Sequence, residues 1–380
     1  MNSLRLRLCI LSVALLFAGC KKEEDIPDPV DQAPSDIPEF YKTKGSDPTF
    51  KEVAGFLDQV SRPKDLAFQK ADGRTNELWV LNYGTVNSGG STVLITNPGM
   101  SSQTTNYLKD GNSWHFMALP TAIDFADNGN WATSAGILDA NRQGGSFTGP
   151  TLWPGDLNIY TRVGSPPTPT VNGSHLDMLH QSPESMGIAH WKDHEFFVFD
   201  GYHGNLTYYD FAEPHYPGGS DHDDGKVIHY PEISLVKSNN DFLPGHMEMD
   251  DDKKWLYIVD TERKRVIRVD VNTGNFNPNT RIARMHGEVL EQYGEMTGVT
   301  WEIFANENLS APCGLAVNGD RVFVSDNGSN EIICFDANTG EEMGRIEVRA
   351  QDLMGIEVGP NNGLWYVDYT TSKVYQVVPQ

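Results

Sequence analysis

The sequence has few basic residues and contains none of the common catalytic signatures. Lys and Arg number 29 against 52 Asp and Glu, which gives a formal net charge of −23. So acidic a chain is not expected to bind the phosphates of a nucleic acid. GxSxG, Walker and HExxH motifs are all missing, so the serine, nucleotide and zinc-protease chemistries that they mark have no support. Beyond the N-terminal segment, no apolar stretch approaches the roughly twenty residues that span a bilayer.

Cysteine is also scarce. Besides two cysteines in the N-terminal segment, the chain has only Cys313 and Cys334. In the strand pattern described below, Cys313 falls on the first strand of a sheet and Cys334 on the third. Two strand spacings of about 4.8 Å exceed the roughly 7 Å that bridged Cα atoms allow. We therefore expect two unbridged thiols.

The N-terminal segment resembles a bacterial lipoprotein signal. Arg5 and Arg7 precede an apolar run that is too short to cross a bilayer, and small residues then stand before Cys20. The resemblance implies that residues 1–20 are a signal peptide and that Cys20 is diacylated, palmitate being one such acyl group. Phe17 is an unusual residue three positions before the cysteine, and the alternative is a plain signal peptide.

Residues 21–48 are acidic, rich in proline and without an apolar period, so they are expected to form a disordered tether. The acidic cluster after Cys20 is similar to surface-export signals of Bacteroidetes lipoproteins. We therefore expect an extracytoplasmic protein anchored to the bacterial outer membrane, with lipid as its only membrane attachment.

Residues 311–348 carry a unit that recurs along the chain. It holds four short apolar runs, CGLAV, RVFVSD, EIICFD and MGRIEV, separated by polar segments rich in Asn and Gly. Such segments favour tight turns, and four strands in about forty residues are typical of one propeller blade. Similar units begin near residues 62, 120, 184, 244 and 352.

The last unit has only three strands, and residues 49–57, TFKEVAGFL, can supply the fourth. We therefore predict an all-β fold over residues 49–380, a six-bladed β-propeller whose sixth blade is closed by an N-terminal strand. Counts of five or seven blades stay open, because the second unit is the least regular.

The segments PCGLAVNGDRVFVSDNGSNEIICFDANTG and MGIEVGPNNGLWYVDYTTSKVYQV resemble the NHL-repeat family of six-bladed propellers. In this family the first strand of each blade lines the central channel. The resemblance therefore places a ring of residues at one channel mouth, namely Lys64, Thr121, Met186, Gly245 or His246, Cys313 and Met354. It is specific for fold and not for function, because such propellers include binding scaffolds, lyases and hydrolases.

Three metals are candidates at or near this channel mouth. His246, Cys313, Met186 and Met354 offer soft ligands that suit copper, although apolar filling of a narrow channel is the plainer interpretation. The related peptidyl-hydroxyglycine amidating lyases hold zinc with histidines at this ring, where the present chain has Cys313 and, one place later than expected, His246. Related calcium-dependent lactonases use carboxylate and amide oxygens, for which the candidates are Glu184, Asp65, Asn82 and Asp326.

Two further patterns have a structural and a functional interpretation. Asp200, Asp260, Asp326 and Asp368 each end a second strand, which favours turn capping over metal binding. Nine of the eleven histidines lie between residues 175 and 246, where HLDMLH (175–180) and SDHDDG (220–225) could bind metal. Neither has a recognised ligand spacing, so we interpret them as solvated loops.

Connections 213–226 and 287–309 are longer than hairpin loops, and long loops are often functional. Loops of this chain also carry many aromatic side chains, which can stack on sugars or grip a peptide. The candidate ligand-binding residues are Tyr202, His203, Trp301 and Tyr369. The favoured function is a binding or scaffold propeller for a protein, peptide or glycan. The alternative is a metal-dependent lyase or lactonase-type hydrolase at the mouth of the channel.

Overall fold

The computed structural model describes residues 37–43, 45–162, 173–240, 242–250, 252 and 254–380. The chain divides into two compact units, Met1–Ala33 and Pro34–Gln380, and the strands belong to the second. Cys20, the predicted signal peptide and residues 21–36 of the predicted tether lie outside the described residues. None of the helices in the described ranges has the length and apolar character needed to cross a membrane.

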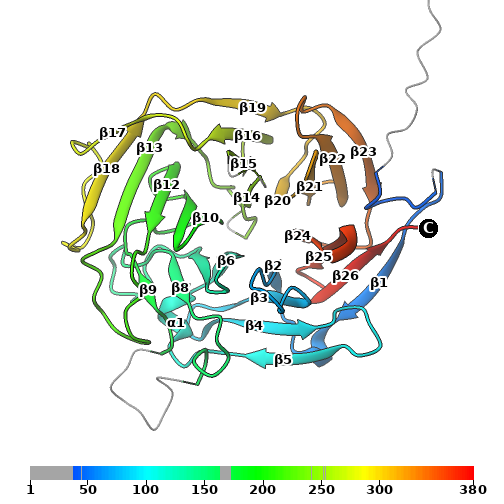
Figure 1. Ribbon diagram of the computed structural model, residues 1–380, viewed down its shortest axis with the longest axis horizontal. Coiled ribbons are helices and arrows are strands. Elements are labelled where there is room, and N and C mark those ends of the chain that lie inside the picture. Colours follow the sequence, from blue (N-terminus) through cyan, green and yellow to red (C-terminus); the bar gives the residue numbers. More distant parts are fainter. Residues whose placement is uncertain (1–36, 44, 163–172, 241, 251, 253) are drawn as a thin grey trace, which may run out of the picture. The chain divides into compact units, whose positions relative to one another are not determined.

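The predicted six-bladed β-propeller is confirmed. Six sheets surround a common axis, and each contains four antiparallel strands that lie side by side in order from the axis outward (Figure 1). Blade 1 consists of β2 (Pro63–Phe68), β3 (Glu77–Thr85), β4 (Gly89–Thr96) and β5 (Thr104–Leu108). Blade 2 consists of β6 (Pro120–Phe125), β7 (Trp131–Ala135), β8 (Thr151–Trp153) and β9 (Asp177–Met178). Blade 3 consists of β10 (Gly187–Lys192), β11 (Glu195–Asp200), β12 (Asn205–Asp210) and β13 (Lys226–Ser234).

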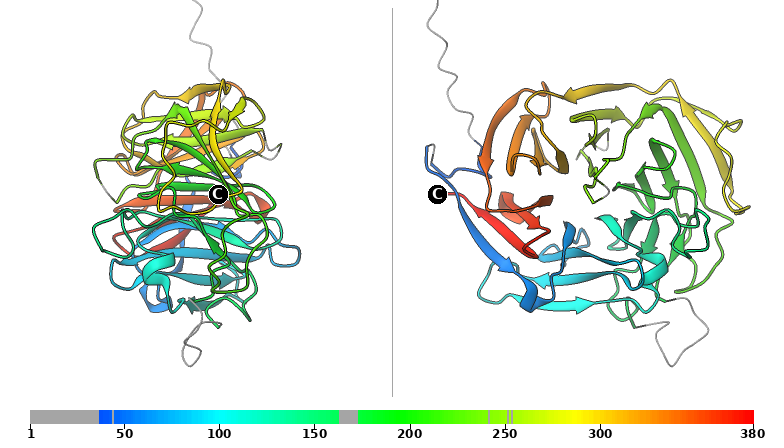
Figure 2. Two further views of the ribbon diagram at one scale, coloured as in Figure 1. Left: turned by 90° about the vertical axis from the view of Figure 1, so that its left-hand side faces the viewer. Right: turned by 180° about the vertical axis from the view of Figure 1, so that it is seen from behind.

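The other three blades complete the ring, which Figure 2 shows from behind and from the side. Blade 4 consists of β14 (Met247–Met249), β15 (Trp255–Asp260), β16 (Arg265–Asp270) and β19 (Trp301–Ala305). Blade 5 consists of β20 (Pro312–Asn318), β21 (Arg321–Asp326), β22 (Glu331–Asp336) and β23 (Glu342–Glu347). Blade 6 consists of β24 (Leu353–Gly359), β25 (Gly363–Asp368), β26 (Lys373–Val378) and β1 (Thr49–Ala54). The short helices are α1 (Ser113–Phe116), η1 (Phe56–Asp58) and η2 (Pro360–Asn362).

Blade 6 is closed by the N-terminal strand, as predicted. Strand β1 pairs antiparallel with β26, and Thr49 lies opposite Val378. The residues before it also pack on the ring, because Ile37 and Phe40 are fully buried in the apolar cluster of blades 5 and 6. Glu39 is buried as well and accepts hydrogen bonds from the guanidinium of Arg321 at 3.0 Å. The end of the segment predicted as a tether is therefore part of the folded domain.

Segment 287–309, predicted as a long connection, contains the strands β18 (Gln292–Thr297) and β19. β18 pairs with β17 (Asn275–Asn277), which precedes that segment, and in parallel with β13 at the outer edge of blade 3. The chain then returns to blade 4 as β19. Strands β17 and β18 carry mostly polar and at least partly exposed side chains, because they cover a sheet edge instead of a core, and they therefore lack the apolar alternation that marks a strand.

Two smaller expectations are confirmed. Cys313 and Cys334 are free and buried on the first and third strands of blade 5. Asp326 accepts hydrogen bonds from the backbone N–H groups of Gly328 and Ala311, both at 2.9 Å, and so caps the turn after its strand. Asp368 and Asp200 make equivalent bonds in blades 6 and 3.

Candidate functional site

Side chains on the innermost strands tie neighbouring blades together around the axis. Asp65 of β2 accepts a hydrogen bond from the N–H of Ile123 in β6 at 2.9 Å. Asp124 of β6 accepts one from the N–H of His190 in β10 at 2.6 Å and pairs with Lys70 at 2.7 Å. Burial and the neighbouring carboxylates raise the pKa of Asp65. Burial acts in the same direction on Asp124, but Lys70 and His190 together, through their charges and hydrogen bonds, lower its pKa.

His246, just before β14, reaches from blade 4 to the opposite side of the axis. Its Nε2 lies 2.9 Å from the carbonyl oxygen of Thr121 in blade 2, so this nitrogen carries the proton. Its Nδ1 lies 3.4 Å from Oδ1 of Asp65 in blade 1. Burial lowers the pKa of His246 to about 4, because the charged ring would lose its water. Of the predicted metal ligands, Asp65 and His246 are thus brought together.

The chain segment that leads into β14 covers this end of the axis. Lys64 is fully buried, and its ammonium donates to the carbonyl oxygen of Phe242. Three aromatic rings surround the ammonium, with centroids 4.5 Å away for Tyr83 and Tyr369 and 5.1 Å away for Phe242. Blades 1 and 4 are opposite each other in a ring of six, so these contacts cross the axis. Leu243 reaches the same side and packs in the apolar cluster of blades 1 and 6.

The other predicted metal residues lie in different surroundings. Cys313 and Met354 are fully buried in the apolar cluster that contains Leu243, and burial raises the pKa of the Cys313 thiol to about 12. Met186 packs in the cluster of blades 3 and 4. Glu184 pairs with Lys237 at 2.8 Å.

The four predicted ligand-binding residues are dispersed over the ring. Tyr369 belongs to the cage around Lys64, and the exposed Tyr202 stacks edge-on against His203 after β11. Trp301 is 37% exposed on the outer strand of blade 4. These residues come from blades 6, 3 and 4.

His203 belongs to one of two groups of potential metal ligands found among the described residues. This group joins Asp200, His203 and His229. Its carboxylate is already engaged, because Asp200 accepts hydrogen bonds from His203 Nδ1 at 2.7 Å and from Ser182 Oγ at 2.8 Å. The two nitrogens of His229 lie 3.1 Å from a threonine hydroxyl and 3.0 Å from Tyr293 Oη. The group therefore has the character of a hydrogen-bonded network.

The second group brings together the two histidine-containing segments noted in the sequence. Asp177 starts β9 in blade 2, and His222 lies in the β12–β13 connection of blade 3, with its Nδ1 2.6 Å from Asp177 Oδ1. His215 of the same connection is the third member. Asp177 is fully buried, so the expectation of solvated loops does not hold here. His215 lies outside both segments, and its only signal in the sequence was the local excess of histidine.

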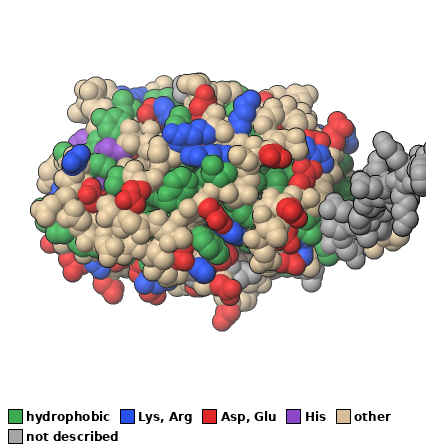
Figure 3. All heavy atoms as spheres, turned by 90° about the horizontal axis from the view of Figure 1, so that it is seen from above, with side chains coloured by type: hydrophobic (Ala, Val, Ile, Leu, Met, Phe, Trp, Pro, Cys, Tyr) green, Lys and Arg blue, Asp and Glu red, His purple; other side chains and the backbone are tan. Residues whose placement is uncertain are grey.

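More aromatic and imidazole rings surround this second group. His180 pairs with Glu288 at 2.9 Å and stacks on Phe147, with 3.9 Å between ring centroids. His115 of α1 lies 5.9 Å from His180 between ring centroids. Figure 3 shows one edge of the molecule, where histidine side chains reach the surface at one end and acidic and basic side chains are mixed elsewhere.

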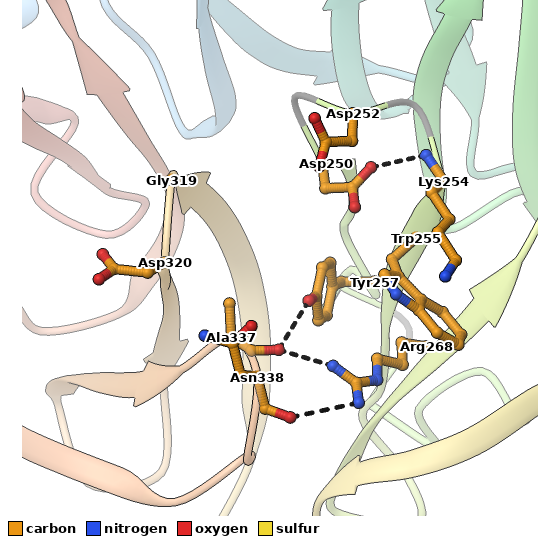
Figure 4. A pocket seen from close by; sticks show the side chains of 10 residues that line it. All are labelled: Asp250, Asp252, Lys254, Trp255, Tyr257, Arg268, Gly319, Asp320, Ala337 and Asn338. Atoms are coloured by element: carbon orange, nitrogen blue, oxygen red, sulfur yellow. Dashed lines mark hydrogen bonds between the residues drawn. The ribbon is translucent and has the colours of Figure 1, made fainter.

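An open cleft of about 490 Å³ lies between blades 4 and 5 (Figure 4). One wall carries the half-buried Trp255 and the phenol of Tyr257, which donates to the carbonyl oxygen of Ala337 on the opposite wall at 3.2 Å. Arg268 also crosses the floor and donates to Ala337 at 2.6 Å, with its guanidinium carbon 4.7 Å from the Trp255 ring centroid. Its lining is completed by Asp250, Asp252, Lys254, Gly319, Asp320 and Asn338.

The charged groups of this cleft differ in how far they are engaged. The guanidinium of Arg268 already has protein partners, since it pairs with Glu302 at 2.5 Å in addition to donating to Ala337. Asp320 is 66% exposed, although it contacts Arg321, and Asp252 is exposed. In Figure 4, Asp250 and Asp252 extend from the β14–β15 turn above Tyr257. The cleft thus presents carboxylates, the Lys254 ammonium and a half-buried indole to solvent, with the ammonium 5.1 Å from the centroid of the Trp255 ring.

No protein-family model matches this sequence, and no curated protein sequence does so either. The fold is similar to a solved auxiliary nutrient binding protein from Bacteroides thetaiotaomicron, with a TM-score of 0.53 at 11% identity over 83% of this chain and 68% of that one. An auxiliary nutrient binding protein from Bacteroides ovatus gives a TM-score of 0.50 at 11% identity, over 87% and 73%. A β-propeller domain from Myceliophteria thermophila gives 0.51 at 9% identity, over 87% and 100%. Such low identities show the fold alone.

Proposed function

We propose that this protein is a lipid-anchored, extracytoplasmic binding propeller of the bacterial cell envelope, and that the cleft between blades 4 and 5 holds a glycan. Cys20 would carry the lipid at the outer membrane, and the tether would connect it to the domain. The observation that carries the choice of ligand is the composition of the cleft around Trp255.

The cleft suits a glycan better than a peptide for a chemical reason. Sugar hydroxyls donate hydrogen bonds to carboxylate and amide oxygens, and this cleft offers Asp250, Asp252, Asp320 and Asn338. An indole provides the apolar surface against which the C–H face of a sugar packs. Its volume lies within the range of ordinary ligand sites. Peptide anchoring usually needs apolar pockets, and the cleft has few apolar side chains.

The end of the axis near Asp65 and His246 is covered by other side chains, and this favours a binding function over the lyase or lactonase alternative. A reaction there needs a path for the substrate to Asp65 and His246. Phe242, Leu243 and the caged Lys64 occupy that end of the axis and contact one another or the opposite blades. The fold likeness to two auxiliary nutrient binding proteins agrees with a binding role.

The proposal is tested with the soluble domain, residues 37–380, on an array of neutral oligosaccharides, followed by titration calorimetry of the best ligand. Trp255→Ala should weaken binding by about tenfold or more, because it removes the aromatic surface of the cleft. Trp301→Ala is the matched control, since this exposed indole lies on the same blade but does not line the cleft.

Two results would overturn the proposal that this cleft holds a glycan. One is an array without any bound glycan while a peptide library yields ligands. The other is a glycan whose affinity falls in Trp301→Ala and not in Trp255→Ala, which would place the ligand on the outer strand of blade 4.

A further inference from the structure

The group formed by Asp177, His215 and His222 has no part in the proposed glycan cleft, which lies between blades 4 and 5. Each of the three residues offers one ligand atom, and these atoms all lie within 4.8 Å of one another. Asp177 comes from blade 2, whereas both histidines come from the β12–β13 connection of blade 3. The group therefore forms where two blades meet.

Two acceptor atoms in this group are buried without a donor. Asp177 Oδ1 accepts hydrogen bonds from His222 Nδ1 and from the N–H of Met178, both at 2.6 Å. The other carboxylate oxygen, Oδ2, has no hydrogen-bond partner among the described residues. His215 Nδ1 lies 2.8 Å from the carbonyl oxygen of Tyr216, so this nitrogen holds the proton and Nε2 has a free lone pair. That Nε2 is also buried and without a partner in the described part of the chain.

An unpaired buried acceptor is costly, because it has lost its water without gaining a donor. A cation bound by this group would satisfy both acceptors. The Asp200, His203 and His229 group provides a contrast inside the same molecule, because its carboxylate accepts hydrogen bonds from Ser182 and His203 and both nitrogens of His229 have hydrogen-bond partners.

We propose that Asp177, His215 and His222 bind one divalent transition-metal ion, with zinc as the best-matched species. Zinc accepts a ligand set of two imidazoles and one carboxylate, and these three ligands leave its fourth coordination position open. Asp177 Oδ2 and His215 Nε2 have the free lone pairs. The Nδ1–H of His222 donates to Asp177 Oδ1, so the lone pair that His222 offers is on its Nε2. Calcium fits less well, because it prefers oxygen ligands.

The neighbouring residues support a bound cation. Glu288 is largely buried and holds His180, whose ring centroid lies 6.1 Å from that of His222. His180 Nε2 is another buried nitrogen without a partner among the described residues. A metal ion at this place would tie the β12–β13 connection to blade 2, so its binding should stabilise the contact between blades 2 and 3.

The test uses untagged protein that has been stripped with chelator, equilibrated with excess zinc and passed through a desalting column. Mass spectrometry of the metal content should give about one zinc ion per chain, and Asp177→Asn and His215→Gln should each lose it. Cobalt provides a second readout. The visible absorption of the bound ion depends on the number and the kind of its ligands, so it distinguishes nitrogen and oxygen ligation in this group from cobalt in solution. His203→Ala is the matched control, and it should retain the zinc.

Folding is checked separately, because Asp177 is fully buried and its variant is the one at risk. His215→Gln changes a half-buried loop residue, so its metal loss counts when its circular dichroism and metal-free melting temperature equal those of the parent. The proposal is overturned by protein that retains no zinc above the column blank. Equal zinc content in His215→Gln and the parent would also overturn it, as would loss of zinc only in His203→Ala.

Discussion

The buried Lys64 leads to a specific dependence of stability on pH. Burial lowers its pKa from 10.5 to about 7 in the folded protein, because the ammonium loses its water inside the ring. The folded-state pKa lies below the unfolded value, so between pH 7 and 10.5 the unfolded chain binds more protons than the folded one. The free energy of unfolding contributed by Lys64 therefore rises with pH over this window.

The size of the effect follows from the two pKa values. Between pH 7 and pH 9, the contribution of Lys64 to the free energy of unfolding should rise by about 2 kcal/mol. The rings of Tyr83, Phe242 and Tyr369 act in the opposite direction, since cation–π contacts favour the charged amine. A smaller rise would therefore measure how strongly the cage holds the ammonium.

The measurement compares the parent domain with Lys64→Met by urea unfolding at pH 7, 8 and 9, followed by tryptophan fluorescence. Groups that titrate in both proteins cancel in the difference between them. Lys192→Met is the control for the removal of a lysine at the surface, because this side chain is 53% exposed. A difference between parent and Lys64→Met that is constant from pH 7 to pH 9 would refute the reasoning, since Lys64 would then stay charged in the fold.

Two further predictions concern the N-terminal part of the chain. Phe40→Ala should destabilise the domain by about 3–5 kcal/mol in urea unfolding, because this fully buried ring packs edge-on against Phe323 at 5.6 Å. A loss below about 1 kcal/mol would mean that the segment before β1 does not belong to the folded ring. Cys20→Ser in the full-length chain should abolish labelling by radioactive palmitate and release the protein from the membrane fraction. Unchanged labelling would contradict lipidation at Cys20.

The sequence by itself determined the blade architecture. Residues 311–348 alternate between apolar runs and tight turns, and they fold into the four strands β20–β23. A meander is a local structure in which each strand pairs with its neighbour along the chain, so short-range patterning suffices to predict it. The missing fourth strand of the last unit likewise pointed to β1 as its partner.

The tertiary structure decided the rest, because those contacts join distant segments. The parallel pairing of β18 with β13 depends on a chain that leaves blade 4 and returns, which no local pattern indicates. Asp177 and His222 are separated by 45 positions, and only the packing of blade 3 on blade 2 places them 2.6 Å apart. The contact of Lys64 with Phe242 spans 178 positions and requires the ring to close before the two residues can meet. Residue types made these positions candidates, and three-dimensional packing decided which of them share a site.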